Sequence, residues 1–387
     1  MRDQIKITNV INPFNKEITV SADKSISIRC VLLASQAIGV SKIYNLLESE
    51  DVINSLKCIK KLGIKYKKFE KYYKIYGYGI NGYNFRNNTK LFAGNSGTLA
   101  RLILGLLINS KKKLILTGDS SLSNRDFSRV ITPLNTFGAN IISKNNSLPL
   151  KISGTEFLRP IKYNERLGSA QCKSAVMLAA IKTPGITIIK AKKSRNHTEL
   201  LFKFLKIPIK IFRNSRYDFI NVKGLSNFKG FNYRVPSDIS SCSFFLVLTL
   251  LSRKSTLKIK NVNINKTRTG VIEILNKMNS KIIFKNKRYY KGEQIADILV
   301  KSRKFNLKGI NCPKRLNSSA IDEFLIIFLI AAKAKGISSF KDLGELNKKE
   351  SPRLDIAVKF LRKLGVKVIR KNNDINIYGN PNLALKG

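Results

Sequence analysis

The pattern of apolar and polar positions repeats along this chain. Five times a polar helix start is followed by an amphipathic helix, a turn and a short strand rich in Lys and Ile. The copies are EDVINSLKCIKKLGIKYK (50–67), SRVITPLNTFGANIIS (128–143), NHTELLFKFLKIPIKIF (196–212), TRTGVIEILNKMNSKIIF (267–284) and SPRLDIAVKFLRKLGVKVI (351–369). Helical spacing that changes to alternation predicts a helix followed by a strand. The helices are expected to end at Gly63, Gly138, Ile207, Asn279 and Gly365. So long a period indicates one supersecondary unit used repeatedly.

A second class of helix lies between these copies. Segments 97–108, 172–182 and 242–252 are almost continuously apolar, and strands are expected after them at 114–119, 186–191 and 255–262. A helix that is apolar on all sides must be enclosed, which favours sheets wrapped around helices. The longest apolar runs, FFLVLTLL (244–251) and FLIIFLIAA (324–332), are too short to span a bilayer and predict fully buried helices. Five copies invite a sixth for symmetry, so the chain is expected to stop one unit short.

Composition narrows the function classes. The chain has 387 residues, of which 43% are hydrophobic, so more than one domain is expected. Its net charge of +48 is spread through every segment, without a basic tail or stripe. A positive field of this kind attracts anionic small substrates, while nucleic acid remains the alternative partner. No membrane partner is indicated.

The cysteines and the N-terminus suggest a compartment. Five scattered cysteines without CxxC spacing, together with one histidine, do not form a zinc motif. Unpaired thiols suit the reducing cytosol. The start, MRDQIKITNV, lacks the apolar core of a signal peptide. A cytoplasmic protein without a metal is therefore expected.

Small polar residues open several of the apolar helices. In GNSGTLARLILGLL (94–107), Ser96 or Thr98 could simply cap the helix, or the exposed backbone N–H groups could bind an anion. In SADKSISIR (21–29), Lys24, Ser25 and Arg29 could converge on a phosphate or carboxylate. The alternative for that trio is a capped helix with two solvated cations.

Several further residues could bind an anion or act as an acid or base, although none of them alone indicates a function. The loop before segment 128–143 carries two arginines, and GSAQCKSAVMLAA (168–180) again opens with small polar residues. The single histidine is most simply a satisfied helix-start residue, and the acids at helix starts are favoured by the helix dipole. Together these positions supply cations, small polar groups and acids: Arg125, Arg129, Ser169, Gln171, His197, Asp238, Asp322, Glu323, Lys349, Glu350 and Arg353.

The order of these motifs is specific. DKSISIR, GNSGTLAR, SLSNRDFSRVITPL, SAQCKSAVMLA, RNHTE, VPSDISS, TRTG, IDEF and KKESPRL follow one another over nearly the whole chain. In this order they resemble the EPSP synthase family of enolpyruvyl transferases. The resemblance implies an α/β fold: a two-domain, inside-out α/β barrel of repeated βαβαββ-type units, of which five of six are evident here. It further implies an upper domain at 21–233, a lower domain at 1–20 plus 234–387, and an active site in the cleft between them.

The resemblance also implies an activity without a cofactor. Members transfer the enolpyruvyl group of phosphoenolpyruvate to the 5-hydroxyl of shikimate 3-phosphate and release phosphate, in the pathway to chorismate and aromatic amino acids. Both substrates are small molecules, and a monomer is expected. By motif, the positions for shikimate 3-phosphate are Lys24, Ser25, Arg29, Ser169, Ala170, Gln171, Arg195, Asp322 and Lys349. Those for phosphoenolpyruvate are Lys24, Asn95, Gly97, Arg125, Gln171 and Arg353, with Arg101 as structural support.

Two acids and a lysine are the implied catalytic residues. Asp322 matches the proton acceptor for the 5-hydroxyl, Glu350 the acid that protonates the methylene carbon, and Lys24 an anion-binding lysine. An addition across a double bond needs one base and one acid. Cations must then hold a carboxylate and a phosphate whose charge shifts as phosphate leaves.

The chain departs from the family pattern in three places. A late Asp-His-Arg motif and a final lysine are absent, Asn347 stands where an arginine is common, and position 97 is Gly where glyphosate-tolerant members often carry Ala. Gly97 therefore implies sensitivity to glyphosate. Two rival functions stay open: an enolpyruvyl transferase for UDP-N-acetylglucosamine, which typically uses a loop cysteine as its acid, and a nucleic-acid-binding protein of related fold.

Overall fold

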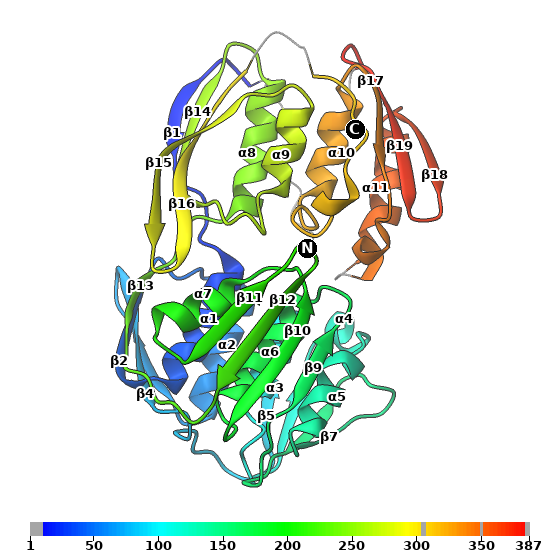
Figure 1. Cartoon of the computed structure of the whole chain (residues 1–387). Coiled ribbons are helices and arrows are strands. Elements are labelled where there is room, and N and C mark those ends of the chain that lie inside the picture. The colour runs from blue at the N-terminus through cyan, green and yellow to red at the C-terminus, as the bar shows by residue number, and fades with distance from the viewer. Residues whose placement is uncertain (1–10, 303–306, 349–350, 384–387) are drawn as a thin grey trace, which may run out of the picture. The chain divides into compact units, whose positions relative to one another are not determined.

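The computed structural model describes residues 11–302, 307–348 and 351–383, and the chain separates into two compact units (Figure 1). The large unit comprises Ser21–Pro236 and Tyr289–Gln294. The small unit comprises the described residues up to Val20, Ser237–Arg288 and the described residues from Ile295 onward. Each unit encloses its own hydrophobic core.

Three central helices form the core of the large unit. They are α1 (Lys24–Gln36), α3 (Gly97–Gly105) and α6 (Ala170–Ala180). Each begins with the same cap, in which the N-cap side chain accepts the N–H of the residue three positions later: Asp23 from Ile26, Ser96 from Leu99 and Ser169 from Cys172. Such caps satisfy N–H groups that have no partner within the helix. The remaining helices are α2 (Glu50–Lys61), α4 (Ser120–Ser123), α5 (Ser128–Thr136) and α7 (His197–Phe204).

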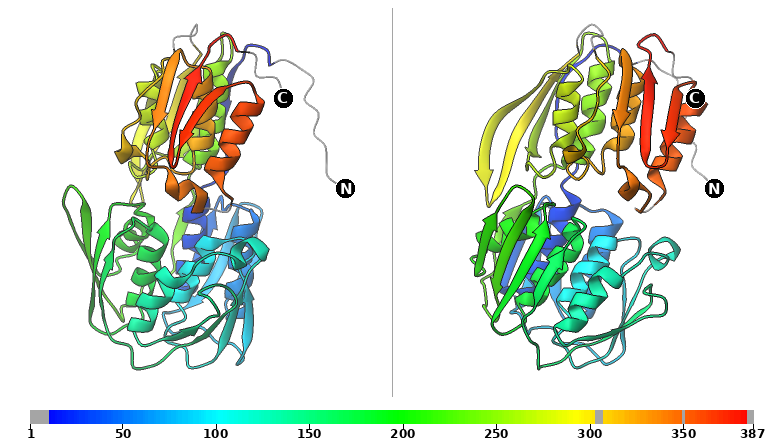
Figure 2. Two further views of the ribbon diagram at one scale, coloured as in Figure 1. Left: turned by 90° about the vertical axis from the view of Figure 1, so that its right-hand side faces the viewer. Right: turned by 45° about the vertical axis from the view of Figure 1, so that its right-hand side comes forward.

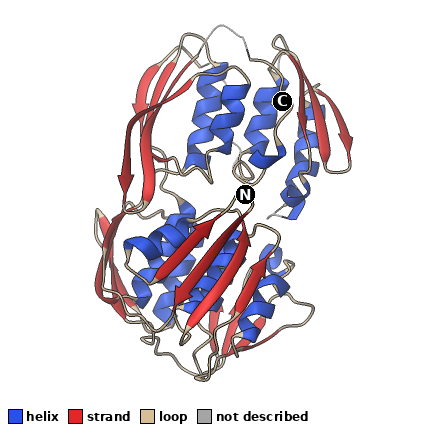
Figure 3. Ribbon diagram, viewed as in Figure 1, coloured by secondary structure: helices blue, strands red, loops and turns tan. Residues whose placement is uncertain are grey.

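Three four-stranded sheets surround these helices, and Figure 3 shows helices inside and strands outside. The first sheet has the order β13 (Asn232–Arg234), β2 (Ile38–Tyr44), β4 (Tyr72–Tyr78) and β3 (Lys65–Lys68). The second has β5 (Thr89–Phe92), β6 (Leu114–Thr117), β8 (Leu150–Ser153) and β7 (Asn140–Ile142). The third has β11 (Ile209–Arg213), β12 (Tyr217–Lys223), β10 (Ile186–Lys192) and β9 (Lys162–Glu165). In β10, buried and exposed residues alternate, so one face covers the helices.

The small unit repeats this plan with two sheets among its described residues. The first has the order β1 (Asn15–Ile18), β14 (Thr256–Asn263), β16 (Glu293–Lys301) and β15 (Ile282–Tyr290). The second has β17 (Gly336–Phe340), β19 (Asp374–Gly379) and β18 (Lys367–Lys371). The helices are α8 (Ile239–Leu251), α9 (Gly270–Lys277), α10 (Phe324–Ala332) and α11 (Arg353–Lys363), with 3₁₀ turns η1 (Lys314–Leu316) and η2 (Gly344–Lys348). Figure 2 shows the second sheet lying over α10 and α11.

The same pairing recurs in the four four-stranded sheets. One edge strand runs parallel to its neighbour, as in β5–β6 and β9–β10, and antiparallel strands follow. In the last sheet, single parallel bridges join residues 308 and 311 to the β17 region. The parallel edge strand is sometimes distant in sequence, because β1 pairs with β14 and β13 pairs with β2. The predicted α/β architecture of repeated units is confirmed.

Two local predictions were wrong. The residue that ends α7 in the left-handed conformation is Lys206, with φ of 57°, and not Ile207, whose side chain is needed in the core. The run 244–251 is not fully buried, since Phe244 is 59% exposed and Phe245 is 40% exposed. In the run 324–332, Leu325 is also exposed. Hydropathy indicates how strongly a side chain favours burial. Whether it is buried depends on which helix faces other elements cover.

Candidate functional site

The starts of the three central helices of the large unit are joined by side-chain hydrogen bonds. The Gln171 amide nitrogen near the start of α6 donates to the Thr98 hydroxyl near the start of α3, at 2.9 Å. From α1, Arg29 Nη2 donates to Ser174 Oγ in α6, at 3.0 Å. The positive ends of three helix dipoles therefore lie at one end of the unit, and such ends attract anions.

Arg101 of α3 holds the other side of the Gln171 amide. Its Nη1 donates to Gln171 Oε1 at 2.9 Å, and its Nη2 donates to the Asp126 carbonyl at 3.1 Å. The guanidinium also lies 4.9 Å from the centre of the Phe127 ring. Burial lowers the pKa of Arg101. Both ends of the Gln171 amide are thus fixed, and Arg101 has contacts suited to the supporting role predicted for it.

Two guanidinium groups approach Gly97, the first residue of α3. Arg125 Nη2 donates to Asn95 Oδ1 at 2.6 Å. A Cβ atom at position 97 would lie 2.8 Å from Arg101 Nη1 and 2.9 Å from Arg125 Nη1. The structure therefore brings Asn95, Gly97 and Arg125 together, and glycine permits that close approach.

The three candidate residues near the start of α1 differ in exposure. Lys24 is 46% exposed at its side chain and forms an ion pair with Asp51 at 2.9 Å. The carbonyl of Ser25 accepts a hydrogen bond from Arg29 Nη1 at 3.0 Å. Arg29 itself is only 4% exposed, so a solvated cation is the wrong interpretation for this residue.

The starts of α6 and α7 contribute further polar groups. Ser169 caps α6, Ala170 is the first residue of that helix, and Arg195 lies half-buried before α7. The neighbouring Ser194 is 8% exposed, and its hydroxyl has no hydrogen-bond partner among the described residues. Ser194 does not stand out in the sequence, and its place beside Arg195 is the one signal that could have indicated it.

The small unit places two candidate residues in contact. Arg353, the first residue of α11, forms an ion pair with Asp322 just before α10, at 2.9 Å, and both side chains are partly exposed. An adjacent guanidinium favours the ionised form of a carboxyl group. Lys349 and Glu350, two further candidates, lie outside the described residues.

A buried network that sequence reasoning missed ties together the starts of α8 and α10. Arg268 is 2% exposed, and its Nη2 donates to Asp238 Oδ1 at 3.0 Å and to Ser240 Oγ at 2.7 Å. The Ser240 hydroxyl in turn donates to Glu323. Asp238 caps α8 by accepting the N–H of Ser240, as its position predicts. The motif TRTG contains Arg268, but its spacing does not reveal that the side chain is buried.

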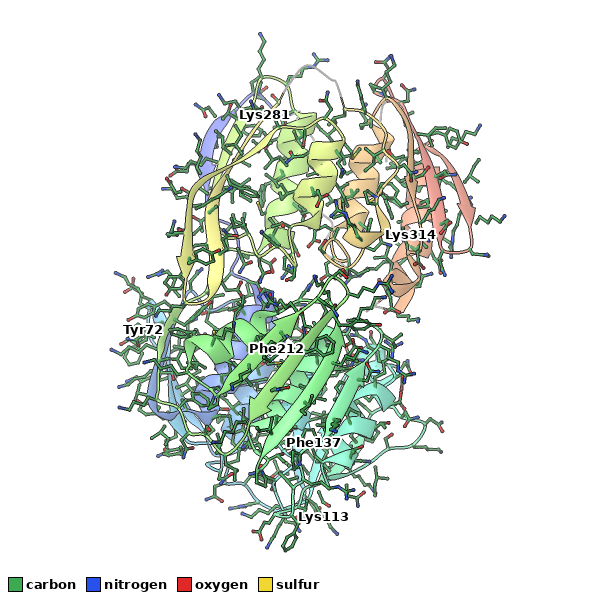
Figure 4. All side chains as sticks on the ribbon, in the orientation of Figure 1. Tyr72, Lys113, Phe137, Phe212, Lys281 and Lys314 are labelled. Atoms are coloured by element: carbon green, nitrogen blue, oxygen red, sulfur yellow. The ribbon has the colours of Figure 1, made fainter. Side chains whose placement is uncertain are left out.

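The single histidine has a partner from a distant strand. His197 Nδ1 lies 2.6 Å from Glu293 Oε1, and both side chains are fully buried. Among the described residues, no group of three or more His, Cys, Asp and Glu is placed to hold a metal ion. Cationic side chains are dispersed over both units, and Figure 4 labels Lys113 just before β6, Lys281 just before β15 and Lys314 in η1.

Comparison with known proteins identifies relatives over nearly the whole chain. The sequence profile described as EPSP synthase (3-phosphoshikimate 1-carboxyvinyltransferase) matches residues 8–387. A 3-phosphoshikimate 1-carboxyvinyltransferase of Ruthia magnifica is 41% identical over 97% of this chain and 84% of its own length. One from Petrotoga mobilis is 37% identical over 97% of this chain and 87% of its own length.

A solved structure agrees in fold. EPSP synthase from Acinetobacter baumannii has a TM-score of 0.83 and 34% identity, covering 95% of this chain and 82% of the other. No described helix is both long enough and apolar enough to cross a membrane.

Proposed function

Because the chain belongs to the EPSP synthase family, we propose that it transfers the enolpyruvyl group of phosphoenolpyruvate to the 5-hydroxyl of shikimate 3-phosphate and releases inorganic phosphate. The joined starts of α1, α3 and α6 carry this proposal. They gather Arg29, Gln171 and Arg125 beside three helix N-termini, a setting suited to substrates that bear phosphate and carboxylate groups.

The residues divide between the two substrates as their motifs imply. In the large unit, the residues that bind shikimate 3-phosphate are Lys24, Ser25, Arg29, Ser169, Ala170, Gln171 and Arg195, and those that bind phosphoenolpyruvate are Lys24, Asn95, Gly97, Arg125 and Gln171. The Ser194 hydroxyl, which has no hydrogen-bond partner in the described part of the chain, is a further group for the phosphate of shikimate 3-phosphate. Asp322, Lys349, Glu350 and Arg353 of the small unit belong to the same proposed reaction.

The reaction is an addition followed by an elimination. The 5-hydroxyl oxygen bonds to C2 of phosphoenolpyruvate while the Asp322 carboxylate accepts the hydroxyl proton, and C3 gains a proton from Glu350. The bond between C2 and the phosphate oxygen then breaks, and C3 loses a proton to restore the double bond. Arg353, paired with Asp322 at 2.9 Å, favours the ionised carboxylate that a base requires. These steps need no cofactor.

The cysteines favour shikimate 3-phosphate over a UDP-sugar as the acceptor. All five are buried. Burial raises the pKa of Cys58 to about 12 and that of Cys312 to about 11. A thiol that must donate a proton from an exposed loop has no counterpart among them. The dispersed cations likewise favour small anionic substrates over a nucleic-acid groove. We further propose that the protein acts as a monomer in the cytoplasm.

Calorimetric titration with shikimate 3-phosphate tests the assignment, with inorganic phosphate and plain shikimate as matched ligands. Saturable binding that needs both ring and phosphate, and that is lost in Lys24→Ala, supports it. Phosphate release on addition of phosphoenolpyruvate then reports the transfer. A folded protein that binds none of the three ligands contradicts the proposal.

A further inference from the structure

Arg29 is oriented by the protein itself. Its Nε donates to Thr198 Oγ1 at 2.8 Å, its Nη1 to the Ser25 carbonyl at 3.0 Å and its Nη2 to Ser174 Oγ at 3.0 Å. A guanidinium has five N–H donors in a fixed plane. Three bonds to three different elements therefore leave the group one orientation, with two N–H groups remaining for a ligand.

Two hydroxyl groups from separate helices accept hydrogen bonds from this guanidinium. Thr198 lies in α7 and Ser174 in α6, and their oxygens are 2.7 Å apart. Thr198 is 1% exposed and Ser174 is fully buried. Because each oxygen accepts from Arg29 and also bonds to the other, moving either hydroxyl moves both contacts.

The adjacent residues in the same two helices form a buried ion pair. Lys173 Nζ and Glu199 Oε1 are 2.7 Å apart, and the side chains are at most 1% exposed. This pair fixes α6 against α7 one residue away from the hydroxyl pair. Burial lowers the pKa of Arg29 to about 10, and the charges of Glu199 and Asp23 oppose that change. Arg29 is thus a cation kept charged within the protein interior.

We infer that Thr198 and Ser174 are positioning residues for shikimate 3-phosphate, acting through Arg29. The inference rests on the proposed function of the Arg29 site. A preoriented cation binds an anion without first losing rotational freedom, and its own interactions with the protein are already made. In this role Thr198 orients the Arg29 guanidinium, and it is Arg29 that contacts the substrate.

Thr198→Val tests this, because it keeps the shape of the side chain and removes the hydroxyl. The Arg29 Nε–H then loses its acceptor inside the protein, and we expect the Kd and KM for shikimate 3-phosphate to rise by about 10- to 100-fold. The KM for phosphoenolpyruvate should change by less than about threefold, well under the effect of one lost charged hydrogen bond. Thr198→Ser should restore tight binding, and Ser174→Ala should weaken it in the same direction.

Thr183→Val is the matched control. Thr183 is also 1% exposed, and its hydroxyl donates to the Ala179 carbonyl, with no bond to Arg29. If Thr198→Val does not fold, Ser174→Ala and Thr198→Ser carry the test. A Thr198→Val or Ser174→Ala protein that binds shikimate 3-phosphate as tightly as the parent overturns the inference, as does an equal loss in Thr183→Val. A parent protein that does not bind shikimate 3-phosphate overturns the proposed function and this inference with it.

Discussion

Replacing Gly97 with alanine should weaken phosphoenolpyruvate binding without unfolding the protein. The added methyl carbon would lie 2.8 Å from Arg101 Nη1 and 2.9 Å from Arg125 Nη1, whereas ordinary contacts begin at 3.4 Å. Both guanidinium tips must therefore retreat by about 0.5 Å. These tips belong to flexible side chains, so the backbone can stay in place.

The size of the effect follows from the bonds that those tips make. Arg101 Nη1 donates to Gln171 at 2.9 Å, and Arg125 donates to Asn95 at 2.6 Å. Losing one hydrogen bond from a charged donor costs about 1.5–3 kcal/mol. Since 1.4 kcal/mol corresponds to a factor of ten, the KM for phosphoenolpyruvate should rise about 10- to 100-fold.

Stability should fall only modestly. The displaced contacts are bonds within the protein, so weakening them lowers the free energy of unfolding, while alanine restricts the unfolded chain and offsets about 0.4–1 kcal/mol of that loss. The variant is therefore expected to fold with a Tm near or somewhat below that of the parent while its KM rises. If glyphosate shares this pocket, as the family resemblance implies, its inhibition constant should increase as well.

The assay is phosphate release at saturating shikimate 3-phosphate with phosphoenolpyruvate varied. Gly344→Ala is a matched control, because Gly344 also opens a helical turn and the nearest atoms to its added methyl would belong to the Asn373 side chain, at 3.0 Å. A Gly97→Ala enzyme whose KM for phosphoenolpyruvate stays within twofold of the parent would refute the crowding argument. An equal rise in Gly344→Ala would also refute it.

Three other perturbations test the packing. Glu199→Gln should lower the free energy of unfolding in urea by about 3–5 kcal/mol, because it leaves the buried Lys173 charge unpaired; an unchanged urea midpoint would contradict this. Burial lowers the pKa of Lys182 from 10.5 to about 7, so the unfolded chain binds more protons between these values and this residue makes stability rise with pH across pH 7–10.5. Lys182→Met should therefore raise the Tm at pH 7 and flatten its pH dependence, whereas an unchanged slope would count against that pKa. The five buried cysteines should react with a thiol reagent only after unfolding, and rapid labelling of the native protein would show that one of them is accessible.

The sequence by itself determined the local structure. Helical and alternating spacings placed the strands β6, β10 and β14 and the helices that precede them, because periodicity is a property of neighbouring residues. Caps such as Ser96 and Asp238 also lie within three residues of the N–H groups they accept from. The order of short motifs was enough to indicate the family, which the comparisons then showed.

Only the tertiary structure decided which distant side chains meet. Arg29 and Thr198 are 169 positions apart, and His197 and Glu293 are 96 apart, so no local pattern records either contact. The same limit explains Phe244, where an apolar run predicted burial but no described neighbour covers that face. A sequence states what each residue prefers, whereas burial and hydrogen bonding depend on the surface that the fold brings against it. The two hydroxyls that orient Arg29, those of Thr198 and Ser174, come from different helices and meet only in the tertiary structure.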